Sequence, residues 1–235
     1  VVFTTALTGG TAVYHWTNSN TAIGLAATGT GNVPSFTATN TTTAPIMGSI
    51  VVYMDYTNAG LTCTSLKDTF HYVVNTTAVV NSINDQVLCN GSTTAAISFS
   101  TTATGGTLTY NWTNNNTSIG LAASGSGNIA SFNATNNTNA PQTAIITVTP
   151  VFTNGGLSCT GTAMNFTITV NPEMIVNAVS SQVLCHNAST TAVNFASPTT
   201  GGTIVYNWTN SNTAIGLAVS GSGNIASFTA TNSSN

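Results

Sequence analysis

The sequence predicts an all-β chain that is built from tandem sandwich-like domains. Three observations support this prediction. First, segments of β-branched and aromatic residues are separated by Gly and Asn. Second, apolar residues alternate with polar ones instead of recurring at helical spacing. Third, nearly the same sequence appears three times at a fixed interval. Of the 235 residues, 41% are hydrophobic, which is enough apolar side chain for each repeat to bury a core of its own.

The repeat is 96 residues long. The stretch "YNWTNSNTAIGLAVSGSGNIASF" begins at Tyr206, and close variants begin at Tyr110 and Tyr14 (206 − 110 = 110 − 14 = 96). This period exceeds the ~20–50 residues of a solenoid unit and suits a row of small independent domains.

The alignment of the three copies predicts the domain boundaries. Val1 aligns with Ile97, and Asn235 aligns with Asn139. We therefore expect a partial repeat at 1–76 without its first strands, a complete repeat at 77–172, and a partial repeat at 173–235 without its last strands. We interpret the sequence as a window from a longer repetitive polypeptide.

The complete repeat is divided into strands by turn signals such as "TGG", "SGSGN" and "TNGG". In "TLTYNWT" the apolar Leu108, Tyr110 and Trp112 alternate with polar residues, as in a half-buried strand. The strands are expected near 80–88, 94–100, 106–113, 117–122, 129–135, 142–151 and 164–170. About seven short strands in a domain of ~100 residues are typical of an immunoglobulin-like sandwich.

The aromatic pair of each copy is expected in the core. These residues are Tyr14, Trp16, Tyr110, Trp112, Tyr206 and Trp208. Exposed tryptophans would instead suit a carbohydrate-binding module, with glycans as partners. We favour the buried tryptophan of a sandwich strand, because it shares one strand face with the tyrosine.

The composition argues against two classes of partner. Only 2% of the residues are charged, and a single Lys or Arg leaves no basic surface for nucleic acid. The longest apolar runs, such as 49–54, are much shorter than the ~18–20 residues of a membrane-spanning helix. We therefore expect no nucleic-acid binding and no membrane insertion.

The repeat also provides a test for catalytic and metal sites, because a site that belongs to the repeat should recur after 96 residues. None of the acidic residues or histidines recurs: Asp55, Asp68, Asp85, Glu173, His15, His71 and His186. The complete repeat has no His and only Asp85 as an acid, too little for a catalytic triad, a carboxylate pair or a calcium site. We expect no enzyme, no metal and no cofactor.

The cysteines do keep the 96-residue step, since Cys63 matches Cys159 and Cys89 matches Cys185. Without metal-type spacing they indicate disulfides and an oxidising, extracellular location. Four cysteines allow three connectivities. One of them joins Cys63 to Cys89 and Cys159 to Cys185 across the domain junctions.

Three stretches of the complete repeat together resemble a known family: "VLCNGSTTAAISF", "YNWTNNNTSIGLAASGSGNIASFNATN" and "ITVTP" followed by "FTITVNP". They resemble the PKD-like and immunoglobulin-like repeats of giant secreted surface adhesins of gliding bacteria, which use type IX secretion. The resemblance implies a disulfide between Cys89 and Cys159, with Cys63 and Cys185 paired outside the window. It also implies the stalk of a cell-surface filament or adhesin that extends a tip domain for attachment or gliding.

The leading hypothesis is therefore a structural repeat region whose partners are neighbouring repeats and other copies of the filament. The alternatives are an array of carbohydrate-binding modules and a self-assembling fibre in which chains exchange strands. An enzyme ranks last.

Overall fold

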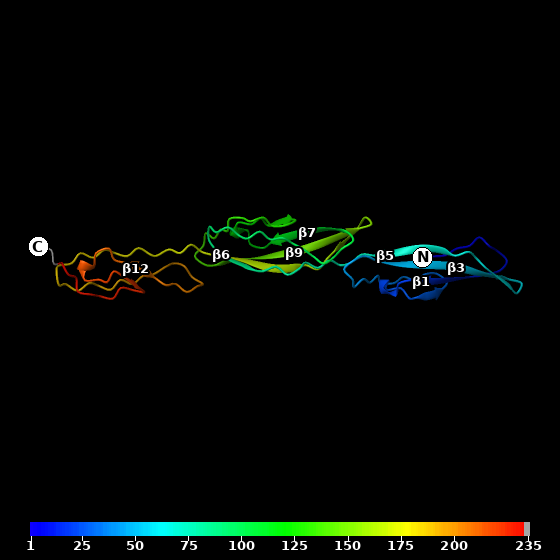
Figure 1. Ribbon diagram of the computed structural model, residues 1–235, viewed down its shortest axis with the longest axis horizontal. Coiled ribbons are helices and arrows are strands. Elements are labelled where there is room, and N and C mark those ends of the chain that lie inside the picture. Colours follow the sequence, from blue (N-terminus) through cyan, green and yellow to red (C-terminus); the bar gives the residue numbers. More distant parts are fainter. Residues whose placement is uncertain (233–235) are drawn as a thin grey trace.

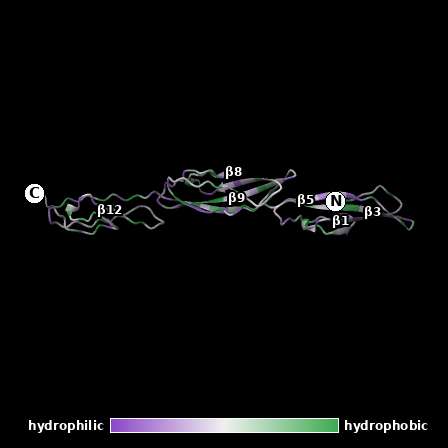
Figure 2. Ribbon diagram, in the orientation of Figure 1, coloured by the Kyte–Doolittle hydropathy of each residue, from purple (hydrophilic) through white to green (hydrophobic). Residues whose placement is uncertain are grey.

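A computed structural model describes residues 1–232 of the chain and shows three bodies in a row along one long axis (Figure 1). We call residues 1–76, 77–172 and 173–232 the first, second and third units. All regular elements of the described residues are strands, apart from three 3-10 helices of three residues each. The all-β prediction is confirmed, and the arrangement is consistent with a β-sandwich. Hydrophobic and hydrophilic residues are interspersed along the whole length (Figure 2).

The second unit contains the fullest sheet, in the order β6-β11-β9-β7-β8, with β10 beside β9. Its strands are β6 (Gln86–Cys89), β7 (Thr107–Asn114), β8 (Ser124–Ser126), β9 (Gln142–Asn154), β10 (Leu157–Thr160) and β11 (Met164–Asn171). The long strand β9 pairs with β7 along one edge and with β11 and β10 along the other. All of these pairs are antiparallel except β6 with β11, which is parallel.

The layer opposite this sheet has less regular structure than the sequence predicts. The expected strands at 94–100 and 129–135 are present only as isolated bridges, which join Thr93 to Asn133 and Ile97 to Ile129. Of the expected strand at 80–88, only the β6 end forms a ladder. Between the two layers lies a buried core that includes Ile97, Phe99, Trp112, Ile119, Ile129, Ile146, Val148, Phe166 and Ile168.

The first unit repeats this plan around a central strand β3 (Ile46–Asn58). The other strands are β1 (Thr11–Asn18), β2 (Thr28–Thr30), β4 (Leu61–Thr64) and β5 (Asp68–Val74). β1 pairs with one edge of β3, while β5 and β4 share the other. The described part of the third unit has β12 (Asn207–Thr209) paired with β13 (Ser220–Ser222). β2, β8 and β13 begin at 28, 124 and 220, which preserves the 96-residue step.

The strand expected at 117–122 is replaced by a single 3-10 turn. The three such turns are η1 (Thr21–Ile23), η2 (Thr117–Ile119) and η3 (Thr213–Ile215). The Asn116 side chain caps η2 by accepting a hydrogen bond from the Ser118 N–H. The turn ends at Gly120, which has a left-handed φ of 94°, and a Cβ there would lie 2.6 Å from the Asn133 carbonyl oxygen. The apolar residues of this stretch thus reach the core from a turn, and Ile119 is fully buried.

The predicted Cys89–Cys159 disulfide is wrong. All four cysteines are free thiols in the structure. Cys89 lies opposite Asn171 at one end of the sheet, whereas Cys159 lies opposite Phe152 at the other. The two ends of β9 are about ten residues apart, or ~33 Å in an extended strand, which is beyond the reach of a disulfide. The pairs Cys63–Cys89 and Cys159–Cys185 are not formed either.

Candidate functional site

The tryptophans of the first two units lie inside the protein. Trp16 and Trp112 are 3% and 8% exposed, and each indole packs flat against a glycine of the following short strand. A Cβ at Gly125 would lie 2.2 Å from Cζ2 of Trp112, so only glycine leaves room for this ring. Neither indole presents a free face on which a sugar could stack.

The tyrosines lie next to these tryptophans at the edge of the core. Tyr110 packs against the core cluster of the second unit, and its ring centroid is 5.6 Å from that of Phe99. Burial raises the pKa of Tyr110. Tyr14 packs at a similar tilt against Phe3, and Tyr206 does so against Phe195.

In the third unit, Tyr206 and Trp208 are half-buried. They line a recess of about 400 Å³ together with Ile175, Phe195 and Ile204. The Trp208 indole still packs against its own glycine, since a Cβ at Gly221 would lie 2.2 Å from Cζ2.

The ionisable side chains do not assemble into a site. His15 Nε2 lies 3.3 Å from Asp55 Oδ2, but this pair has no equivalent 96 residues further on. Asp85 accepts a hydrogen bond from the Thr167 N–H at 2.6 Å. Within residues 1–232 no three His, Cys, Asp or Glu side chains come close enough to hold a metal ion. That part of the chain also has no helix that is long and apolar enough to cross a membrane.

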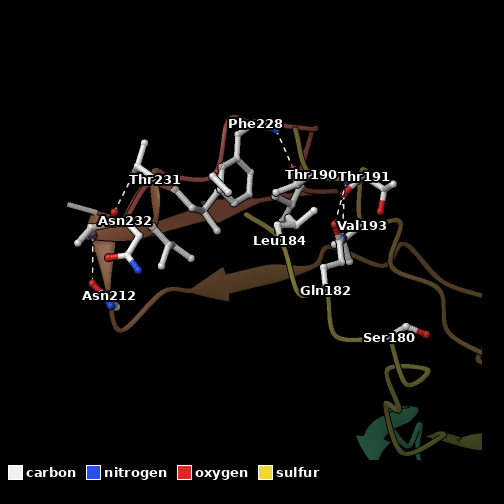
Figure 3. Close-up of a pocket in the computed structure, with 15 residues that line it drawn as sticks. Ser180, Gln182, Leu184, Thr190, Thr191, Val193, Asn212, Phe228, Thr231 and Asn232 are labelled. Carbon is white, nitrogen blue, oxygen red and sulfur yellow. Dashed lines mark hydrogen bonds between the residues drawn. The ribbon is translucent and has the colours of Figure 1, made fainter. Parts of the chain in front are cut away.

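A groove with a volume of about 600 Å³ lies in the third unit (Figure 3). Its lining includes Ile215, Leu217, Ile225 and Phe228. The matching positions of the second unit belong to the core that β9 and β11 cover; Ile119, for example, is 0% exposed, whereas Ile215 is 40% exposed. The groove therefore has the character of an uncovered sandwich core, not of a pocket with converging polar groups.

Hydrogen bonds also recur at the junctions between units. At the first junction the Thr104 N–H donates to the Thr43 carbonyl at 2.8 Å, and at the second the Thr200 N–H donates to the Asn139 carbonyl at 2.7 Å. Donor and acceptor both shift by 96 residues, so the two junctions use the same bond. A glycine next to each donor lies close to a proline of the preceding unit: a Cβ at Gly105 would lie 2.9 Å from Pro45 Cδ.

An asparagine shapes the acceptor loop at each junction; it is half-buried in the first unit and buried in the second. Asn136 is 2% exposed, and its Nδ2 donates to the carbonyls of Ala140 and Val170, both at 2.8 Å. Its Oδ1 accepts from the N–H and the hydroxyl of Thr138. Asn40 makes the matching set of four bonds in the first unit. The asparagine thus fixes a short loop that contains Thr43 in the first unit and Asn139 in the second. The carbonyls of these two residues accept the bond between units.

A second set of contacts closes the first junction. Asn75, directly after β5, donates from Nδ2 to the Asn154 carbonyl at 3.2 Å and accepts from Asn154 Nδ2 at 2.9 Å. Thr76 donates its hydroxyl to the Thr42 carbonyl. The two bonds between Asn75 and Asn154 join the end of the first unit to the β9–β10 hairpin of the second, whereas the Thr76–Thr42 bond lies within the first unit. The two units are therefore held at several points, which opposes bending at the linker.

The sequence interpretation did not identify these junction residues. The signal was present, because "ATNTTTAP" at 38–45 recurs as "ATNNTNAP" at 134–141. A stretch rich in Asn and Thr predicts a solvated turn, whereas the structure buries Asn136.

No protein-family model matches the chain, and no curated protein matches it significantly.

Proposed function

We propose that the chain is a structural repeat region that serves as a spacer. It forms the stalk of an extracellular bacterial surface filament or adhesin and holds a tip domain away from the cell. The observation that carries the proposal is the hydrogen bond that recurs at both junctions, from Thr104 to Thr43 and from Thr200 to Asn139. If the same bond forms at every junction, each unit has the same orientation relative to the unit before it. The three units in Figure 1 form an extended row, as this predicts.

The composition supports the same role. Lys67 is the only basic side chain, so trypsin-like proteases have almost no cleavage site on an exposed fibre. The buried positions of Trp16 and Trp112 favour a core function over a glycan-stacking surface. We assign the units to the immunoglobulin-like or PKD-like sandwich class. We infer the extracellular location from their resemblance to the adhesin repeats.

The proposal is tested with arrays of two, four and eight copies of residues 77–172. Their end-to-end distances are measured by negative-stain electron microscopy and small-angle scattering. A stalk predicts that length grows in proportion to the number of copies. Growth with the square root of that number would indicate freely jointed units and would refute the rigid stalk.

A matched pair of variants tests the junction itself. Thr104→Pro removes the N–H that bonds the preceding unit, whereas Thr104→Ser keeps it. In the arrays we expect the proline variant to broaden the distribution of end-to-end distances and the serine variant to leave it unchanged. Equal distributions would show that this hydrogen bond does not set the geometry.

A further inference from the structure

One face of the sheet in the second unit points away from its core. On β9 the inward residues, such as Ile146 and Val148, are fully buried, so the residues between them point outward. These outward positions of β9 are Thr143, Ile145, Thr147, Thr149, Val151 and Thr153. We call the outward side chains of β7, β9 and β11 the outer face.

The outer face is lined mainly by threonine and carries no charged side chain. On β7 Asn111 lies among three outward threonines, and on β11 Asn165 lies beside Thr167 and Thr169. Asp85 is the only charged residue of 77–172, and it lies at the edge of the sheet, where its carboxylate accepts the Thr167 N–H. Surfaces of soluble domains are normally designed with ~25–35% charged side chains. This face, by contrast, can be covered without removing an ion from water.

The chemistry of the outer face makes it complementary to itself. Each threonine hydroxyl and each asparagine amide can both donate and accept a hydrogen bond. An interface between two identical surfaces requires this property, because each surface must satisfy its own copy. Thr143 and Thr169 already share a hydrogen bond of 2.9 Å within the face, which leaves fewer hydroxyl groups to satisfy on contact. The threonine methyl groups, with Ile145 and Val151, supply apolar surface between the hydroxyls.

The equivalent face of the first unit differs, which restricts the self-complementary surface to the second unit. His15 stands where the second unit has Asn111, and Asp55 stands where it has Val151. His15 Nε2 lies 3.3 Å from Asp55 Oδ2, and His71 adds another ionisable side chain to this face. These groups form no catalytic or metal site, but removing them from water would cost free energy. The face of the second unit carries no such cost.

The outer face is also large enough for a stable dimer. The five strands β6, β11, β9, β7 and β8 span ~24 Å at ~4.8 Å for each strand. The eight residues of β7 extend ~27 Å along the strand direction. Each copy therefore offers ~650 Å², or ~1,300 Å² for the pair, which is within the ~1,200–2,000 Å² of specific interfaces.

We propose that the outer face of the second unit packs on the same face of a second copy of this chain. The two sheets lie ~10 Å apart with their strands within about 30° of each other, as in other face-to-face sheet pairs. The strands run along the long axis of the row, so the two chains lie side by side (Figure 1). This inference goes beyond the stalk, because it joins neighbouring chains laterally.

Sedimentation equilibrium of the full 235-residue chain tests the proposal, with a reductant present so that the thiols do not cross-link. We expect the average mass to rise from monomer to dimer with concentration. Thr147 lies on the central strand β9, near the expected two-fold axis. Thr147→Lys and Thr147→Glu each place like charges opposite one another, so each should raise the dimer dissociation constant at least tenfold. An equal mixture of the two variants should associate again, which also shows that both are folded.

Two matched controls carry the same charge elsewhere. Ser131→Lys is exposed on the opposite layer, and Val51→Lys is the first-unit equivalent of the Thr147 position. Both should associate like the wild type. A monomer at every concentration would overturn the proposal, as would a dimer that survives both Thr147 variants or is weakened equally by Ser131→Lys. An equal loss in Val51→Lys would overturn the restriction to the second unit. The arrays of residues 77–172 test the stalk separately, through their end-to-end distances.

Discussion

The glycine beneath each tryptophan offers the sharpest test of the core. In Gly125→Ala the new Cβ would lie 2.2 Å from Cζ2 of Trp112, whereas ordinary contacts begin at 3.4 Å. The indole or the strand must therefore move by about 1.2 Å to restore ordinary contact (3.4 − 2.2). Trp112 is 8% exposed, so the ring has almost no solvent-filled space into which it could move.

The expected cost follows from two opposing effects. Overpacking of a core costs about 1–3 kcal/mol. Replacing a strand glycine by alanine restores roughly 0.5–1 kcal/mol of conformational entropy. At the middle of the two ranges the second unit should therefore lose about 1 kcal/mol of stability, and its midpoint of thermal unfolding should fall by several degrees, at about 4–8 °C per kcal/mol for a domain of this size.

Hydrogen exchange read by mass spectrometry assigns the loss to a unit, because peptides from 77–172 are resolved from the others. Gly202→Ala is the control, since a Cβ there meets nothing within 4 Å. Trp112→Phe removes the clashing ring, so the double variant should lose less than the sum of the single losses. If Gly125→Ala is as stable as the wild type, the packing described here is wrong.

Three further predictions concern the junction asparagine, the tyrosine and the thiols. Asn136→Ala should cost about 3 kcal/mol, at about 1 kcal/mol for each lost bond to the backbone of Ala140, Val170 and Thr138, and Asn40→Ala should cost less because water reaches that half-buried site; equal losses in chemical denaturation would contradict this. The raised pKa of Tyr110 means that the unfolded chain releases the phenol proton first, so wild-type stability should fall as pH rises through about 10, and Tyr110→Phe should fall less; parallel melting curves would rule this out. Maleimide should label four thiols without a reductant, whereas fewer adducts would indicate a disulfide.

The elements with clear alternation were predictable from the sequence. The strand expected at 106–113 appears at Thr107–Asn114, and the strand expected at 164–170 appears at Met164–Asn171. Both have apolar residues at every second position and are bounded by turn residues, so local pattern and tertiary packing agree. The 96-residue step could also be read directly, and the observed elements keep it.

The errors arose where local sequence does not determine partners. "TSIGLA" at 117–122 is apolar enough for a strand, but the asparagine before it and the glycine within it favour a capped turn. The cysteine pairing that the resemblance implied failed because a sequence likeness does not show at which end of a sheet a residue lies. Only the strand register places Cys89 and Cys159 at opposite ends.

The junction asparagines were hidden for a different reason. Asn136 is polar and lies in a stretch rich in Asn and Thr, so composition indicates a solvated turn. Its burial depends on two carbonyls, Ala140 and Val170, and the second of these lies 34 residues away. A long-range hydrogen bond of this kind leaves no periodic pattern in the sequence of one repeat. The comparison of two repeats shows only that the asparagine recurs.

The position of the junction bond within the repeat has a consequence for how such a chain changes over generations. The second unit carries the donor, Thr104, and the acceptor, Asn139, for its two different neighbours. Insertion or deletion of one whole repeat would change the chain by 96 residues as one block. Every product of such an event retains a matched donor and acceptor at each boundary. The number of repeats can therefore change without any compensating substitution at the junctions.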